Sequence, residues 1–78
     1  MERNIKVLSE LLINTKAYID SLNCNGNIRR RLLDLGLVKN SSITPVLESP
    51  SGDPRAFEIR GTLIAIRKED ANLIKIYV

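Results

Sequence analysis

The chain has 78 residues, of which 44% are apolar and 27% are charged, and its net charge is +3. This composition is typical of a small folded domain rather than a disordered segment, and we expect a single domain over residues 1–78. The chain has no histidine and one cysteine, so it is short of ligands for transition metals and of the usual general bases and nucleophiles. We therefore expect no enzyme activity, no catalytic residues, no metal site and no cofactor.

Cys24 is the only cysteine, which excludes an intramolecular disulfide and fits a reducing cytosol. No apolar stretch reaches the length of a signal peptide or of a membrane span. We expect a cytoplasmic protein with no direct membrane insertion.

The amino-terminal part of the chain predicts a short helical segment followed by a strand. Apolar residues recur at helical spacing within residues 5–13, which indicates a short helix or turn. Residues 16–22 alternate imperfectly and are followed by asparagine and glycine, which favours a first strand with a loop at residues 23–26.

A helix over about residues 27–35 is the clearest single element. Asn25 or Asn27 can cap its start. Ile28, Leu32 and Leu35 form the expected buried stripe, and Gly36 supplies the left-handed residue that ends the helix. Leu33 points away from that stripe, so we expect it to be exposed.

Beyond Gly36 the apolar runs are typical of strands joined by short turns. Residues 42–48 predict a strand, and Pro45 within it requires an edge position or a bulge. Proline, glycine and aspartate at 50–54 predict a turn between two strands, the second of which contains Phe57 and Ile59.

The last third of the chain continues the pattern. Gly61 predicts a sharp bend before residues 62–67, which are apolar on both faces and therefore indicate a central strand. Residues 68–71 predict a polar helical turn, and Ile74, Ile76 and Val78 are expected to face inward in the final strand. About five strands and one inserted helix predict a mainly β fold, a small antiparallel sheet curled into a barrel.

Three arginines, Arg29, Arg30 and Arg31, occupy the first turn of the predicted helix. A cation there opposes the helix dipole and costs about 0.3–1 kcal/mol. One interpretation is a solvated or internally paired cluster, and the candidate partners are Asp20, Asp34, Glu48 and Glu58. The other is a docking surface in which Arg29 and Arg30 steer an acidic partner and Leu33 anchors it.

Several short segments together resemble the FeoA family over about residues 8–78. They are residues 30–37 (RRLLDLGL), 52–54 (GDP), 60–62 (RGT), 66–67 (IR) and 71–78. The resemblance implies an SH3-like barrel with an inserted helix. It also implies a small cytosolic accessory protein of bacterial ferrous iron uptake that acts with the membrane GTPase transporter FeoB. The same domain ends metal-dependent repressors of the diphtheria-toxin-repressor type, but no helix-turn-helix is present here, so we expect the stand-alone form.

The chain departs from this family at two turns. The family usually has proline-glycine ahead of the first strand, where this chain has Ile13-Asn14, and glycine before the second strand, where this chain has Asn40. Asparagine tolerates left-handed backbone better than other non-glycine residues, so Asn40 is a conservative replacement. Transition-metal binding is a property often given to the family, but this chain has no soft ligands that support it.

We predict a module that binds the cytosolic part of a FeoB-like transporter through Arg29, Arg30 and Leu33. The resemblance implies that Thr62 and Arg67 lie near the open side of the barrel, where a peptide can contact them. One alternative is a nucleic-acid-binding small barrel, which the basic charge supports, although the chain has only two tyrosines and one phenylalanine for base stacking. A weak iron sensor is a further alternative, and a weak homo-oligomer is left open.

Overall fold

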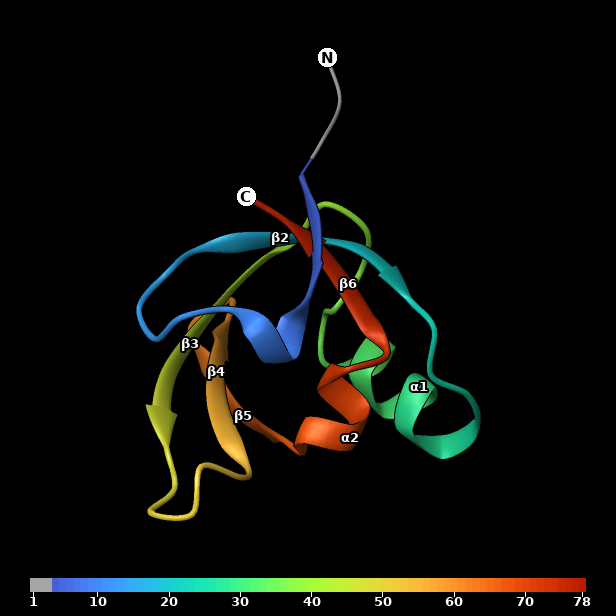
Figure 1. Ribbon diagram of the computed structural model, residues 1–78. Helices are drawn as coiled ribbons and strands as arrows, with labels where there is room; N and C mark the ends of the chain where they lie inside the picture. The colour runs from blue at the N-terminus through green and yellow to red at the C-terminus, as the bar shows by residue number, and fades with distance from the viewer. Residues whose placement is uncertain (1–3) are drawn as a thin grey trace.

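The computed structural model describes residues 4–78, which form one antiparallel sheet of six strands with two α-helices and a short 3-10 helix (Figure 1). The strands are β1 (Ile5–Val7), β2 (Ala17–Leu22), β3 (Ser42–Glu48), β4 (Arg55–Ile59), β5 (Thr62–Ile66) and β6 (Ile74–Tyr77). The helices are η1 (Leu8–Glu10), α1 (Gly26–Asp34) and α2 (Lys68–Ala71). The spatial order of the strands is β1-β6-β2-β3-β4-β5, so β1 and β5 lie at the two edges.

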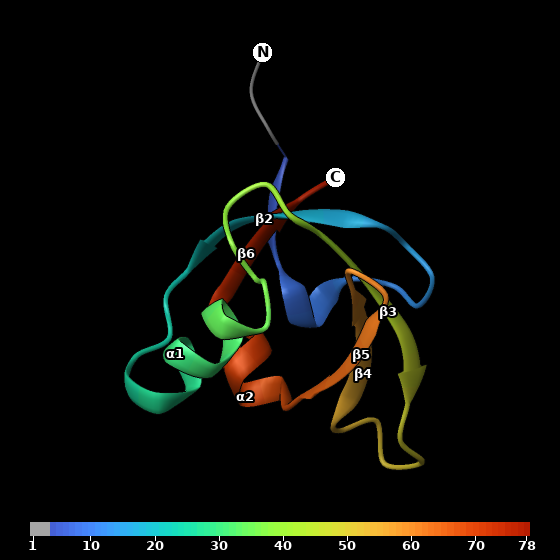
Figure 2. The ribbon, with the colours of Figure 1, turned by 180° about the vertical axis from the view of Figure 1, so that it is seen from behind.

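Two irregularities allow the sheet to curl. The register between β2 and β6 shifts between Ile19 and Ser21, and that between β3 and β4 shifts between Pro45 and Leu47. Each shift is a bulge, which bends its strand and increases the local twist. Figures 1 and 2 show the strands wrapped around a common interior rather than lying flat. The predicted bulge at Pro45 is therefore confirmed, and β3 lies between β2 and β4, not at an edge.

The interior is filled by side chains from strands, helices and loops alike. Phe57 of β4 is fully buried, and four isoleucines of β5 and β6 are at most 4% exposed: Ile64, Ile66, Ile74 and Ile76. The inward positions predicted for Ile74 and Ile76 are thereby confirmed. Val78, which was expected to face inward, is 56% exposed. This prediction is wrong because β6 ends at Tyr77 and the alternation ends with it.

The amino-terminal prediction is half correct. Residues 8–10 form the helical turn η1, but residues 5–7 form β1, which pairs with β6 and raises the number of strands from about five to six. Ile5 and Lys6 of β1 are both exposed, so the spacing of apolar residues carries no signal for this strand.

Helix α1 ends as its sequence predicts. Gly36 has a φ of +102°, its N–H donates to the carbonyl of Leu33 at 3.0 Å, and the N–H of Leu37 donates to the carbonyl of Leu32 at 3.0 Å. This pair of bonds is a Schellman motif, and its usual apolar contact brings Leu37 into the core beside Leu32. Leu35 is 36% exposed, so Leu37, not Leu35, completes the buried stripe.

The start of α1 differs from the prediction. Asn25 occupies the N-cap position, but its side chain makes no capping hydrogen bond. Asn27 lies inside the helix, which begins at Gly26. Asn25 therefore precedes the helix without satisfying any of its free N–H groups through its side chain.

Both asparagines at the family's two variant turns have left-handed backbone. Asn14 has a φ of +67° in a turn closed by the N–H of Thr15 donating to the carbonyl of Leu12 at 3.1 Å. Asn40 has a φ of +71°, and its side-chain oxygen accepts a hydrogen bond from the Tyr77 hydroxyl at 2.6 Å. The interpretation of Asn40 as a conservative replacement for glycine is confirmed.

Strand β5 is not central, contrary to the prediction. It pairs with β4 alone among the strands of residues 4–78, and Leu63 on its outer face is 59% exposed. A run that is apolar on both faces therefore lies at an edge.

Helix α1 stands on the same side of the molecule as α2 (Figures 1 and 2). Within residues 4–78, neither α-helix has the length and apolar character needed to cross a bilayer.

Gly36 has a second constraint besides its positive φ. A methyl group added at its Cα would lie 3.3 Å from Cδ of Arg60, which stands in the tight turn between β4 and β5. Gly52 also has a positive φ, of +86°, but nothing lies within 4 Å of a Cβ there. A side chain at either glycine would be strained by the positive φ, but only a side chain at Gly36 would also contact another residue.

We predict that Gly36→Ala destabilises the fold more than Gly52→Ala. Both variants place an L-residue in left-handed backbone, which costs about 1–2 kcal/mol. Gly36→Ala also requires the side chain of Arg60 to shift by a few tenths of an ångström, which adds to that cost. Urea unfolding measures the difference, and Arg60→Ala in the Gly36→Ala background should recover the additional loss. Equal unfolding midpoints for the two glycine variants would contradict the contact with Arg60.

Candidate functional site

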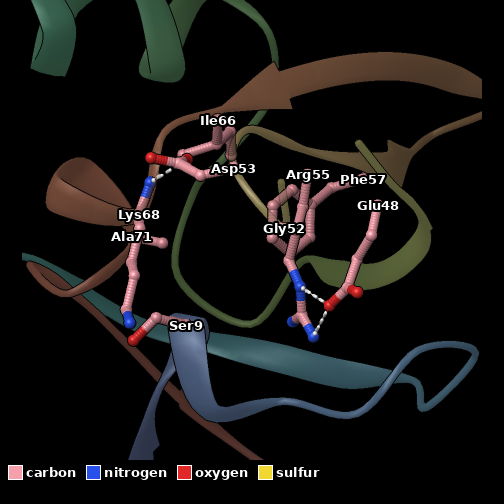
Figure 3. A pocket seen from close by; sticks show the side chains of 9 residues that line it. All are labelled: Ser9, Glu48, Gly52, Asp53, Arg55, Phe57, Ile66, Lys68 and Ala71. Atoms are coloured by element: carbon pink, nitrogen blue, oxygen red, sulfur yellow. Dashed lines mark hydrogen bonds and ion pairs between the residues drawn. The ribbon is translucent and has the colours of Figure 1, made fainter. Parts of the chain in front are cut away.

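Charged side chains gather in two places, and the first is a pocket of about 230 Å³ between η1, α2 and the turn that joins β3 to β4 (Figure 3). Nε and Nη2 of Arg55 donate to the same carboxylate oxygen of Glu48, at 2.9 and 2.7 Å, and Nη1 donates to the carbonyl of Leu11 at 2.6 Å. On the other wall, Asp53 accepts the backbone N–H of Lys68 at 2.8 Å. Ser9 lies at the floor, where its hydroxyl donates to Asn72.

These bonds give the pocket a structural role. Arg55 of β4 holds β3 through Glu48 and the loop after η1 through Leu11, and Asp53 fixes the start of α2. Arg55 and Asp53 are thus already occupied in joining elements that are distant in sequence. The sequence analysis missed Arg55, because an arginine between a turn and a strand gives no signal of its partners.

The second place is the outer surface of α1, where the three arginines differ in role. Nη1 of Arg29 donates to the carbonyl of Leu22 at 2.7 Å and ties the helix to the end of β2. Arg29 therefore has a structural role that its position in the helix did not predict. Arg30 and Arg31 are exposed and have no hydrogen bond or ion pair with any residue of 4–78.

The acids proposed as internal partners do not neutralise this cluster. In the described part of the chain, the ion pair between Arg55 and Glu48 is the only one formed, at 2.7 Å. Arg30 and Asp34 lie four residues apart on α1 but make no ion pair. The internally paired form of the first interpretation is therefore wrong, whereas its solvated form agrees with the exposed positions of Arg30 and Arg31.

Leu33 lies one turn beyond Arg29 and is 38% exposed, as expected from its place outside the buried stripe. It lines a shallow hollow together with Gly26, Arg29, Arg30 and Asp34. Leu33 and the unpaired Arg30 are thus neighbours on the surface of α1.

The structure brings Arg30 and Thr62 together but places Arg67 apart from them. Thr62 begins β5 and lines one groove with Arg30 and Arg31. Arg67 is exposed at the N-cap position of α2 and lines a neighbouring hollow with Arg31. Arg31, which the sequence analysis did not assign to the contact surface, thus borders both hollows.

No group of three or more histidine, cysteine, aspartate and glutamate side chains suited to a metal ion occurs among residues 4–78. Cys24 is 1% exposed in the core.

The profile of the FeoA domain matches residues 6–78. The chain belongs to the FeoA family. The Fe(2+) transport protein A/Fe(2+) transporter FeoB fusion protein of Porphyromonas gingivalis is 35% identical to it over 69 residues, 88% of this chain. Those residues are 8% of that protein, so the chain spans only a small part of this curated relative.

Solved FeoA structures share the fold. The FeoA protein of Chlorobium tepidum superposes with a TM-score of 0.89 at 33% identity, over 94% of this chain and 70% of that chain. The FeoA of Stenotrophomonas maltophilia, described as an SH3 domain protein and complexed with zinc, gives a TM-score of 0.81 at 32% identity, over 91% and 88%. The SH3-like fold implied by the family resemblance is thereby confirmed.

A manganese-dependent transcriptional repressor has the same fold, with a TM-score of 0.84 at 9% identity over 99% of this chain and 43% of that chain. At that identity the likeness concerns the fold alone.

The structural role of Arg55 leads to a stability prediction. Arg55→Lys keeps the charge but loses the planar fork that reaches Glu48 and Leu11 together. Since hydrogen bonds to charged groups contribute about 1.5–3 kcal/mol each, we expect a loss of about 2 kcal/mol in urea unfolding. Arg30→Lys is the matched control, because an exposed and unpaired arginine should change stability by less than about 0.5 kcal/mol. Equal midpoints for the two variants would show that Arg55 does not hold the pocket together.

Proposed function

We propose that this chain is a small cytoplasmic accessory protein of ferrous iron uptake that binds the cytosolic part of a FeoB-like membrane GTPase transporter. The observation that carries the proposal is the Porphyromonas gingivalis relative, in which a FeoA-like sequence and FeoB form one polypeptide. A covalent link gives two domains a high effective concentration for each other. The fusion therefore supports the view that FeoA-like and FeoB domains act by binding each other.

The surface that supports the proposal is formed by Arg30 and Leu33 of α1, which line one hollow and are here called the α1 surface. Arg31 lies on the other side of Arg30, in the groove beside β5. Arg30 lies at the middle of α1 and Arg31 lies in its last turn, so the prediction that they occupy the first turn, where the helix dipole opposes a cation, is wrong. No acid of residues 4–78 forms an ion pair with either of them. Unpaired exposed charge contributes more to association rate and orientation than to stability of the free protein. We infer a complementary acidic patch on the transporter's cytosolic part, with Leu33 as the apolar contact.

This chain acts by binding the transporter and performs no catalytic step. Arg29 is left out of the contact set because its guanidinium already holds Leu22. Thr62 and Arg67 remain candidates for contact with the same partner, since both are exposed next to Arg31 or Arg30.

The direct test is calorimetric titration of the full chain with the cytosolic GTPase domain of FeoB from the same organism. The titration is repeated with the domain free, bound to GDP and bound to a non-hydrolysable GTP analogue. Saturable binding in at least one nucleotide state supports the proposal. An absence of binding in all three states, with the domain's GTPase activity intact, would overturn it.

We predict that Arg30→Glu weakens this complex at least tenfold, because it reverses a charge at the centre of the α1 surface. Stability should change by less than about 0.5 kcal/mol, since Arg30 is exposed, forms no ion pair and lies at the middle of α1, away from both ends of the helix dipole. Lys16→Glu makes the same change in net charge in the loop before β2, which lies on the opposite side of the molecule from α1 (Figures 1 and 2). If both variants weaken binding equally, net charge and not the α1 surface determines affinity.

A further inference from the structure

The outer edge of β5 has backbone groups without partners. A two-residue turn of Arg60 and Gly61, both with positive φ, joins β4 to β5, and Ile59 pairs with Thr62 across it. In such a hairpin the closing pair is hydrogen-bonded, and hydrogen-bonded pairs then alternate along the ladder. Thr62, Ile64 and Ile66 therefore bond to β4, while the N–H and C=O groups of Leu63 and Ala65 point away from it. No backbone group among residues 4–78 bonds to them.

Helix α1 stands beside this edge and leaves a groove of about 470 Å³. The strand wall consists of residues 62–65, and the helix wall includes Arg30, Arg31, Asp34 and Leu35. Leu63 and Ala65 are exposed and apolar, so the strand wall offers both free backbone groups and apolar contacts. An extended segment can satisfy such an edge by adding a strand, which is a common mode of peptide recognition.

The charges around the groove select the chemistry of the occupant. Arg30 and Arg31 stand on the helix wall without ion pairs, and Arg67 lies beyond the end of β5 in the hollow next to Arg31. Asp34 is the one acid in the groove lining among the described residues, so two arginines face one carboxylate there, and Asp70 lines the hollow that holds Arg67. The groove is thus net cationic, and a segment with acidic side chains complements it.

We propose that an acidic extended segment of the partner protein adds to the sheet along β5, bonding to the backbone of Leu63 and Ala65 while Arg30 and Arg31 contact its carboxylates. This inference rests on the proposed function and specifies how the partner binds. A second copy of this chain is disfavoured as the occupant, because pairing two β5 edges would bring two sets of arginines together. Like charges placed side by side in an interface cost affinity.

The edge can be blocked without removing a side chain. Ala65→Pro eliminates the N–H that points away from β4 and leaves the β4–β5 bonds intact, because proline is tolerated where an edge strand's N–H faces outward. Ala65→Thr is the matched control, since it fills the same exposed position with a good strand former and retains the N–H. We expect Ala65→Pro to weaken binding of the FeoB cytosolic domain at least tenfold and Ala65→Thr to leave it within twofold.

Amide hydrogen exchange of the wild-type chain provides a second test that does not depend on the folding of a variant. The amides of Leu63 and Ala65 should exchange rapidly in the free protein and at least tenfold more slowly when the cytosolic domain is saturating. The amides of Thr62 and Ile64, which bond to β4, should be protected in both states. Protection confined to Leu63 and Ala65 is the expected signature of strand addition.

The outcomes separate this inference from the proposed function. If Arg30→Glu weakens the complex while Ala65→Pro does not, or if Leu63 and Ala65 exchange freely in the saturated complex, strand addition is wrong and the proposed function stands. If the wild-type chain does not bind the cytosolic domain at all, both are wrong.

Discussion

The bulges in β2 and β3 are the constraint on which the rest of the structure depends. A flat antiparallel sheet of six strands has two faces, and 78 residues cannot cover both. The register shifts after Ile19 and after Pro45 fold the sheet over itself, so that one face encloses Phe57 and the isoleucines while the other meets solvent. Pro45 contributes directly, since a residue without an N–H is tolerated where the ladder is already interrupted.

The curled sheet still has two edge strands, β1 and β5. The β1 edge is only three residues long and carries Lys6, and both features are known to discourage further pairing. The β5 edge has neither protection, because Leu63 and Ala65 are apolar and its outward backbone groups are free. Arg30 and Arg31 of α1 lie opposite this second edge, so the unprotected strand faces a helix wall with two arginines and one acid, Asp34.

Features set by local backbone chemistry could be predicted from the sequence. Gly36 ends α1, Pro45 accompanies a bulge and Asn40 takes left-handed backbone, because each depends on the residue's own conformational limits. Features that depend on the path of the chain between elements could not. Leu37 replaces Leu35 in the core only because the helix end reverses the chain, and Arg29 bonds to Leu22 only because the loop after β2 returns to the helix. For the same reason the sequence identified Arg30 and Leu33 as surface residues but missed Arg31 as the residue shared by two hollows.

The incorrect prediction of β5 as a central strand is informative in itself. Apolar residues on both faces of a strand normally mean that both faces are buried, yet three of the five residues of β5 are exposed. Exposed leucine on an unpaired edge contributes little to the stability of the free protein and favours edge-to-edge association. The apolar composition of this exposed edge is explained if a partner covers the edge in the complex. The positive charge of Arg30 and Arg31 on the helix wall then has two effects. It repels a second copy of this chain, and it attracts an acidic partner.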